Sequence, residues 1–292
     1  MPTFDTPTPI SITVELVVGD LRVTATDRID TVVEIHPSDP TKQSDVDAAE
    51  QTRVEYSNGA LLVKTPKSWR QFGSRKGADS VDILIDVPTG SHLHAMTGVA
   101  SLHSAGRLGE CHYDAGVGDA QIDEASPIAI RIGVGDITVD RTSGHADTKT
   151  GSGSVRIGRI AGTAVVRNAN GDTWVGDVTD DLRVSSANGR IVIDRAGATV
   201  TAKTATGDIR IGEVRGGTIV AHTSMGAIDI GVLEGVPAWL DLNTSFGKVA
   251  NALDAADKPE PGADSVKVHA RTSFGDIRIN RAVADVTVGT AR

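Results

Sequence analysis

Short runs of alternating apolar and polar residues recur along the chain at intervals of about 18 residues. A glycine marks each interval, and apolar side chains stand two and four residues after it, separated by polar ones. This alternation has the period of a strand with one buried face. We call the marking residues anchor glycines: Gly98, Gly118, Gly135, Gly153, Gly171, Gly189, Gly207, Gly226, Gly247 and Gly275.

A second apolar pair stands seven and five residues before most anchor glycines, and a small polar residue stands three before. Each repeat therefore predicts two short strands and a third, briefer side. A unit this small cannot bury its apolar face alone, whereas stacked copies share one continuous core. The pattern predicts an all-β fold, a parallel β-solenoid with about 18 residues per coil. It is expected to be right-handed, as about 98% of parallel crossovers are.

The ends of the chain depart from this period. Gly19 and Gly59 fit the frame at about twice the spacing, so residues 1–90 predict an irregular N-terminal β cap. Extra strands are expected at 31–35 and 81–87, with a short helix at 42–51. The regular solenoid would then cover 91–280, with an insertion at 251–265 and a tail at 281–292. Atypical terminal units are expected, because they must shield an exposed strand edge.

The repeated Gly-Asp-Ile/Val units, such as Gly207-Asp208-Ile209, resemble the bacterial putative-adhesin family of β-strand-repeat proteins, a family of unknown function. The opening residues 1–9 and the run 272–277 are similar to actinobacterial members. The resemblance covers nearly the whole chain. It implies the repeat fold and surface display, and it brings no catalytic residues. The architecture is also similar to that of bactofilins, which are cytoskeletal β-solenoids that polymerise end to end.

Composition narrows the class of protein further. The chain has 32 glycines but only 3 Trp, 2 Tyr and 4 Phe, as expected of a thin interior with little room for rings. Its net charge of −9 gives no general attraction to nucleic acid or to an anionic membrane. No apolar run is long enough to span a bilayer. Residues 1–5 lack the features of a secretory signal, which favours a cytoplasmic protein; surface display would need a non-standard route.

One outward column of the predicted solenoid is rich in cations. Cations recur at the position four residues before the anchor glycine and at the neighbouring outward position of the same strand. Only one acid, Asp147, lies among them. The functional interpretation is a face that binds an anionic polymer or a protein. The alternative is a solvated face whose long stems lie on the sheet. The candidate anion-binding residues are Arg131, Lys149, Arg167, Arg183 and Lys203.

The segment 67–76 combines two aromatic residues with four cations and no acid. It predicts either a partner-binding loop or a plug folded back onto the solenoid end. Trp174 stands at an outward strand position and is a further candidate for an exposed aromatic residue. The partner-binding candidates of the loop are Lys67, Trp69, Arg70, Phe72, Arg75 and Lys76.

Other polar positions favour structural roles. The Asp that often follows the anchor glycine suits a turn, and these acids alternate with other residues along the stack, unlike a calcium ladder. Cys111 is predicted to point inward, and as the only cysteine it excludes an internal disulfide. His92 and His112 are expected to share a column, but no third ligand is evident. The sequence thus predicts no metal site, no cofactor and no catalytic residue.

Catalytic residues are usually carried by loops, so a uniform rod without long loops is not expected to form an active site. We therefore expect a non-catalytic structural or interaction scaffold that binds a protein or an anionic polymer along its basic face. One alternative is a self-assembling filament former similar to a bactofilin. A second alternative is a carbohydrate-active β-helix enzyme, which would need clustered carboxylates in a groove.

Overall fold

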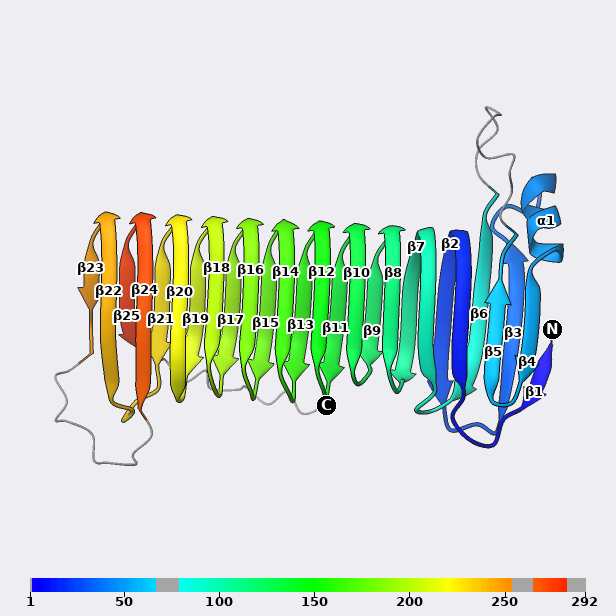
Figure 1. Ribbon diagram of the computed structural model, residues 1–292, viewed down its shortest axis with the longest axis horizontal. Coiled ribbons are helices and arrows are strands. Elements are labelled where there is room, and N and C mark those ends of the chain that lie inside the picture. The colour runs from blue at the N-terminus through cyan, green and yellow to red at the C-terminus, as the bar shows by residue number, and fades with distance from the viewer. Residues whose placement is uncertain (1, 67–78, 254–264, 283–292) are drawn as a thin grey trace, which may run out of the picture. The chain divides into compact units, whose positions relative to one another are not determined.

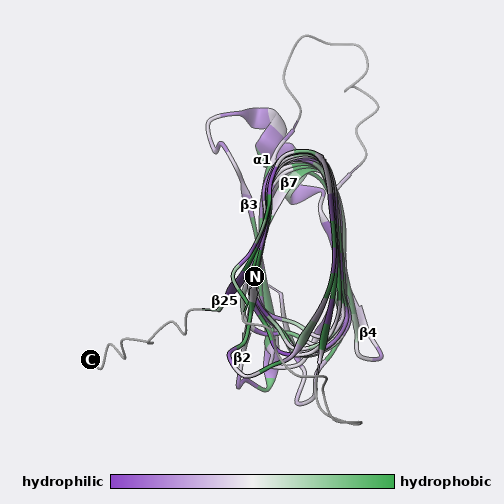
Figure 2. Cartoon of the chain, turned by 90° about the vertical axis from the view of Figure 1, so that its left-hand side faces the viewer, coloured by the Kyte–Doolittle hydropathy of each residue, from purple (hydrophilic) through white to green (hydrophobic). Residues whose placement is uncertain are grey.

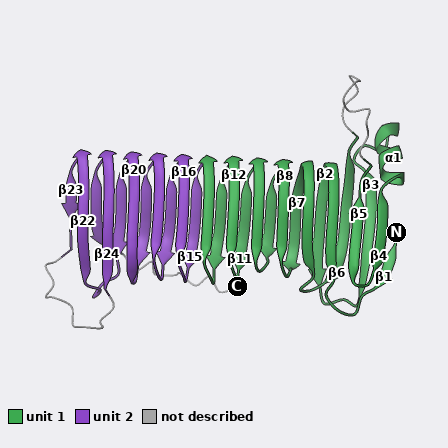
Figure 3. Ribbon diagram, viewed as in Figure 1, with its two compact units in different colours: residues 1–170 green, residues 171–292 purple. Residues whose placement is uncertain are grey.

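A computed structural model describes residues 2–66, 79–253 and 265–282 of the chain. It divides into two compact units, residues 1–170 and 171–292 (Figure 3), which are described separately below. Both consist of β-strands, apart from one short helix in the described part of the first unit. The boundaries predicted for the cap, the regular solenoid and the tail stay predictions.

Unit 1 contains regular coils, each made of one strand on either of two faces (Figure 1). Strands of one face pair in parallel and in register with those one coil away. One face holds β8 (Cys111–Val117), β10 (Ile128–Val134), β12 (Ala146–Ser152) and β14 (Ala164–Asn170). The other holds β9 (Ala120–Glu124), β11 (Ile137–Thr142) and β13 (Val155–Ile160).

Before these coils, two strands of 16 residues each cross both faces, β2 (Ser11–Thr26) and β7 (His92–Arg107). β2 pairs with β7 on one side and with β5 (Ala60–Lys64) and β6 (Val81–Pro88) on the other. Antiparallel strands then follow: β4 (Arg53–Ser57) on β5, β3 (Asp30–Pro37) on β6, and β1 (Thr3–Asp5) on β3. The expected extra strands and the helix α1 (Gln43–Glu50) are thereby confirmed.

Unit 2 repeats the two-face coil. One face holds β16 (Leu182–Asn188), β18 (Val200–Thr206), β20 (Gly217–Met225), β22 (Ala238–Phe246) and β24 (Val266–Phe274). The other holds β15 (Thr173–Val178), β17 (Ile191–Ala196), β19 (Ile209–Val214), β21 (Ile228–Val232), β23 (Val249–Asn251) and β25 (Ile277–Arg281).

The sense of the coil is the same in each unit. In Figure 1 the even-numbered strands of the regular coils face the viewer and run upward, and the odd-numbered ones run downward behind them as the chain advances to the left. The view along the stack likewise shows strands on two opposite faces, with β3 and β4 of unit 1 on opposite sides (Figure 2). The fold is therefore the right-handed parallel β-solenoid that the sequence predicts.

The last coils of unit 2 do not stack in chain order, although the glycine series suggested successive coils. β24 pairs with β20 on one side and with β22 on the other. On the opposite face β25 likewise pairs with both β21 and β23. The final coil, residues 266–281, thus lies between two coils that precede it in sequence, and β22/β23 become the outermost described coil.

Within each unit, hydrogen bonds between adjacent coils recur at the anchor glycines. At most of the anchors with a small polar side chain three residues before, that side chain donates to the carbonyl of the adjacent coil's anchor, as Thr150 does to Gly135 at 3.0 Å and Thr223 to Gly207 at 2.9 Å. The first coil departs from the expected frame. Ala100, not Gly98, packs against Gly118 and pairs with Gly19, which shifts the assumed register there by two residues.

Candidate interaction surfaces

Three of the predicted anion-binding residues form a column on unit 1. Arg131 pairs in register with Lys149, and Lys149 with Arg167, on β10, β12 and β14. Asp147 lies beside this column, with its carboxylate 2.6 Å from the Arg167 guanidinium and 3.9 Å from that of Arg131. The surface therefore carries cations partly neutralised by an acid that serves two arginines.

The other two predicted cations lie on unit 2. Arg183 on β16 and Lys203 on β18 are both exposed, at neighbouring outward positions of adjacent coils. Lys203 pairs in register with Ser185 and His222, and Arg183 with Thr201. These two cations thus form a basic patch on a strand face of unit 2.

The aromatic residues predicted to bind a partner are not found as exposed side chains in the described structure. The partner-binding loop residues from Lys67 to Lys76 lie outside the described residues. Trp174 does point outward on β15, but it is half-buried rather than exposed. Its indole Nε1 donates to Asp194 Oδ1 at 3.3 Å, because the large ring lies across the outer face of the next coil. The prediction of an exposed aromatic residue at this position is therefore wrong.

The Asp column after the anchor glycines has the structural role expected of it. Asp119 Oδ1 accepts a hydrogen bond from the backbone N–H of Asp136 at 2.8 Å, and Asp136 Oδ1 accepts one from Ser154 at 2.6 Å. In unit 2 Asp172, Asp208 and Asp276 accept the same bond from the adjacent coil. Each carboxylate thus satisfies a turn amide of the neighbouring coil.

The cysteine and histidine candidates show no ligand constellation. Cys111 points inward and is fully buried, and burial raises the pKa of its thiol to about 12. His112 stacks on His94 with ring centroids 4.7 Å apart, instead of sharing a column with His92, because of the register shift in the first coil. Across the described ranges, no three His, Cys, Asp or Glu side chains cluster as metal ligands would.

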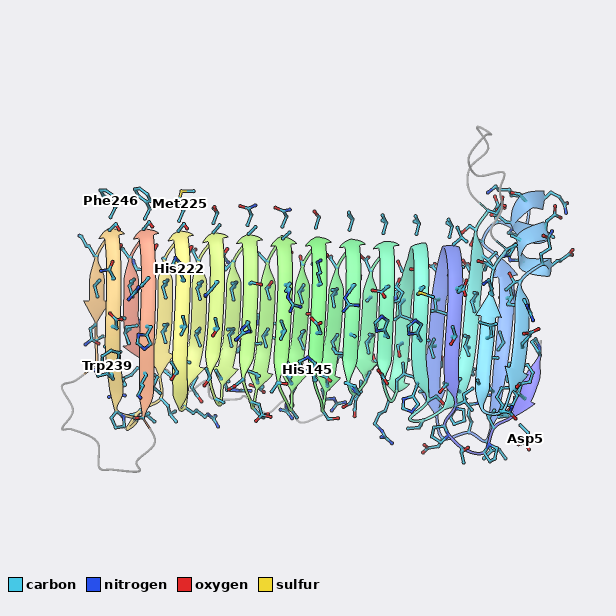
Figure 4. The ribbon with its side chains drawn as sticks, viewed as in Figure 1. Asp5, His145, His222, Met225, Trp239 and Phe246 are labelled. Carbon is cyan, nitrogen blue, oxygen red and sulfur yellow. The ribbon has the colours of Figure 1, made fainter. Side chains whose placement is uncertain are left out.

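A feature that the sequence interpretation missed is an apolar row at one turn of the coil. Met225 pairs with Phe274, and Phe274 with Phe246, at the ends of β20, β24 and β22. Their exposed fractions are 52%, 53% and 67%, and Met225 and Phe246 project outward beyond the strand ends in Figure 4. The two phenyl rings stack at a centroid distance of 4.8 Å and an interplanar angle of 7°. We call these three residues the apolar edge.

Unit 1 has an aliphatic counterpart at the equivalent turn. Val99, Val117 and Val134 pair in register on three adjacent coils, and all three are about half exposed. In both units these residues directly precede the anchor position, so the signal is readable as a column of the repeat. Its meaning depends on which coils are neighbours, which the repeat does not encode.

One known protein family matches almost the entire chain. A model described as Toastrack DUF4097 matches residues 8–288. The chain belongs to this family. The Toastrack assignment agrees with the solenoid described above and with the β-strand-repeat resemblance of the Gly-Asp-Ile/Val units.

Solved structures similar to this Toastrack chain include two that are titled as putative adhesins. The one from Bacteroides fragilis NCTC 9343 is 12% identical, with 95% of each chain covered and a TM-score of 0.36. The one from Parabacteroides merdae ATCC 43184 is 10% identical, covering 95% of this chain and 94% of that one, with a TM-score of 0.34. No curated protein matches the chain. Among the described residues no helix has the length and apolar character needed to cross a membrane.

Proposed function

We propose that this Toastrack protein is a non-catalytic scaffold that binds a protein partner along the apolar edge of unit 2. The observation that carries the proposal is the row of Met225, Phe274 and Phe246, each more than half exposed. Single exposed apolar residues are ordinary, but adjacent large ones mark contact surfaces. Aromatic residues and Met are enriched at the centres of protein interfaces, whereas a polyanion would be bound mainly by cations.

The geometry of the row favours recognition. Phe246 and Phe274 are held in parallel by neighbouring strands of one sheet, with their rings stacked. Side chains already ordered in this way lose little conformational entropy when a partner covers them. The rigid rungs would therefore act as anchors for apolar side chains of the partner.

The polar groups of the coils support a role without catalysis. A catalytic site needs a nucleophile or acid–base pair in mutual reach, with its pKa tuned to the reaction. Here the acids after the anchor glycines bond turn amides, and those on the outer faces pair with arginines, as Asp177 does with Arg195. The buried thiol of Cys111 is held protonated. These contacts account for the groups in structural terms.

The cationic columns favour a second candidate, an anionic polymer bound along a strand face. Lys149 is exposed between Arg131 and Arg167, so three cations follow one another along the stack. Asp147 offsets part of this charge, which argues for weak, salt-sensitive binding. Arg183 and Lys203 offer a second patch of the same character.

Site-specific photocross-linking in the native host tests the proposal. A benzophenone amino acid is placed at position 274 on the apolar edge, at 149 on the cationic column, or at Arg210, an exposed residue on the opposite face of unit 2. We expect one discrete protein adduct from position 274 and none from 210. The Met225→Ser variant should reduce that adduct about 30-fold, the effect of losing an interface anchor worth about 2 kcal/mol.

Three other outcomes would count against the apolar edge. An adduct from 149 with none from 274 would place the partner on the basic face instead. Equal adducts from 274 and 210 would indicate non-specific contact. Absence of any adduct from position 274 in host cells would overturn the proposal.

A further inference from the structure

The outermost described coil of unit 2 ends in open strand edges. β22 pairs with β24 and β23 with β25, and no other described strand pairs with either on the far side. A strand paired on one side only presents a row of free N–H and C=O groups. This edge is therefore a template on which another strand can be added.

Among the described residues, the solenoid interior is also exposed at this coil. Leu240 and Leu242 face inward on β22 but are only half-buried, whereas Val268 and Ala270 in the adjacent coil are fully buried. On the other face Val249 is 47% exposed, while Ile277 beside it is 0% exposed. One more coil, with apolar side chains on both faces, would bury these residues.

The described strands of this edge, β22 and β23, contain no proline and few of the charges that usually prevent strand addition. β22 carries one charged residue, Asp241, and β23 carries none. Asp241 points outward and its carboxylate lies 3.2 Å from His269 Nδ1 and 3.5 Å from the Arg271 guanidinium. It is therefore already paired within its own chain and does not guard the edge.

In unit 1, by contrast, the edge strands are protected against strand addition. The parallel strands β5 and β6 are covered by antiparallel β4 and β3. β4 has five residues and carries an ion pair between Arg53 and Glu55, β1 has only three residues, and α1 packs against β3. Short, charged edge strands resist pairing. Each chain thus has one described coil open to strand addition.

We propose that the protein forms a two-fold symmetric dimer in which β22 and β23 of one copy pair with the same strands of a second copy. Two-fold symmetry presents the same patch from both copies and makes the paired edge strands antiparallel, a geometry that buries Leu240, Leu242 and Val249 on both sides. Since only one coil is open in the described part of each chain, the assembly closes at two copies and does not extend into a filament.

Charge favours a second copy at this place. The chain as a whole has a net charge of −9, so two copies repel each other over most of their surface. Residues 238–251 contain one acid, Asp241, and one base, Lys248, and so carry no net charge. The copies therefore meet where their mutual repulsion is smallest and their apolar exposure is large.

Sedimentation equilibrium of the full chain over a wide concentration range tests this proposal. We expect a limiting mass of twice 30.3 kDa for the wild type. The Val249→Lys/Asn251→Lys variant places charges on inward-facing, exposed positions of β23 and should halve that mass. Ala250→Lys, at the outward position between them, is the matched control and should remain dimeric.

A wild type that stays at 30.3 kDa, or whose mass keeps rising beyond twice this value, overturns the closed dimer. So does a double lysine variant that remains dimeric. Hydrogen exchange gives a readout that does not depend on any variant: the β22 amides should become protected as the wild type is concentrated. Protection that is the same at low and high concentration would contradict pairing with a second copy.

Discussion

Replacing Gly189 by alanine is expected to cost unit 2 at least about 3 kcal/mol of unfolding free energy. Gly189 has φ +141°, a conformation that side chains disfavour, and a Cβ there would lie 2.0 Å from the carbonyl oxygen of Gly171 in the adjacent coil. The obstacle is backbone, not a flexible side chain, because the nearest atoms all belong to the main chain of Gly171 and Asp172. To relieve this clash, the two paired coils would have to move apart, which would break the hydrogen bonds between them next to the turn.

Gly235→Ala supplies the matched control in the same unit. Gly235 also has a left-handed φ, +80°, but nothing lies within 4 Å of the position its Cβ would take. Alanine there should cost only about 1 kcal/mol, the strain of the backbone conformation alone. Urea unfolding followed by circular dichroism measures both variants. Equal costs would mean that close coil-to-coil approach at the anchor glycines does not limit stability.

The second large effect is expected at Tyr113, a fully buried ring in a solenoid whose sequence predicts little room for rings. Its hydroxyl donates to the carbonyl of Ala100 at 2.5 Å and accepts from the Thr97 hydroxyl at 3.3 Å. Burial raises the pKa of this phenol. Tyr113→Ala should cost about 3–5 kcal/mol through the cavity it leaves.

Tyr113→Phe separates the hydroxyl from the ring. It keeps the packing but leaves the Ala100 carbonyl without this donor, so about 1–2 kcal/mol should be lost. Tyr56→Phe on β4, where the ring is only half-buried and contacts Phe4 at a centroid distance of 5.1 Å, should change stability by less than about 0.5 kcal/mol. Denaturant titrations of the three variants give the ranking. A harmless Tyr113→Ala would show that the ring is not packed as described.

Much of the fold was readable from the sequence because each coil repeats the same local chemistry. The inward positions of β17 and β19 were visible as Ile191, Ile193, Ile209 and Ile211, all essentially buried. The outward direction of Arg131 and Lys149 followed from the same period. Where one residue departs from the repeat, the prediction is wrong: Ala100 stands in an anchor position, and the glycine pattern assigns the nearby Gly98 to it.

The order of the last coils could not be predicted from the repeat. Every coil offers the same two apolar strands, so the pattern of 266–281 fits on β20/β21 or beyond β22/β23 equally well. The ion pairs of the cationic column could not be predicted from the repeat either. Asp147 is offset from Arg131 and Arg167 along the strands, and only the register shows that it reaches both.

The position of the final coil decides which residues of the apolar edge are neighbours, and it leaves β22 and β23 as the open strands. Intramolecular disulfide formation between engineered cysteines tests it directly. In Met225→Cys/Phe274→Cys the two residues lie on adjacent rungs, about 4.8 Å apart, within the range a disulfide spans. In Met225→Cys/Phe246→Cys they lie two rungs apart, about 10 Å, which is too far. We expect the first pair to form an intramolecular disulfide under mild oxidation and the second to stay reduced. A disulfide in the second pair and none in the first would mean that the coils stack in chain order and would contradict this account.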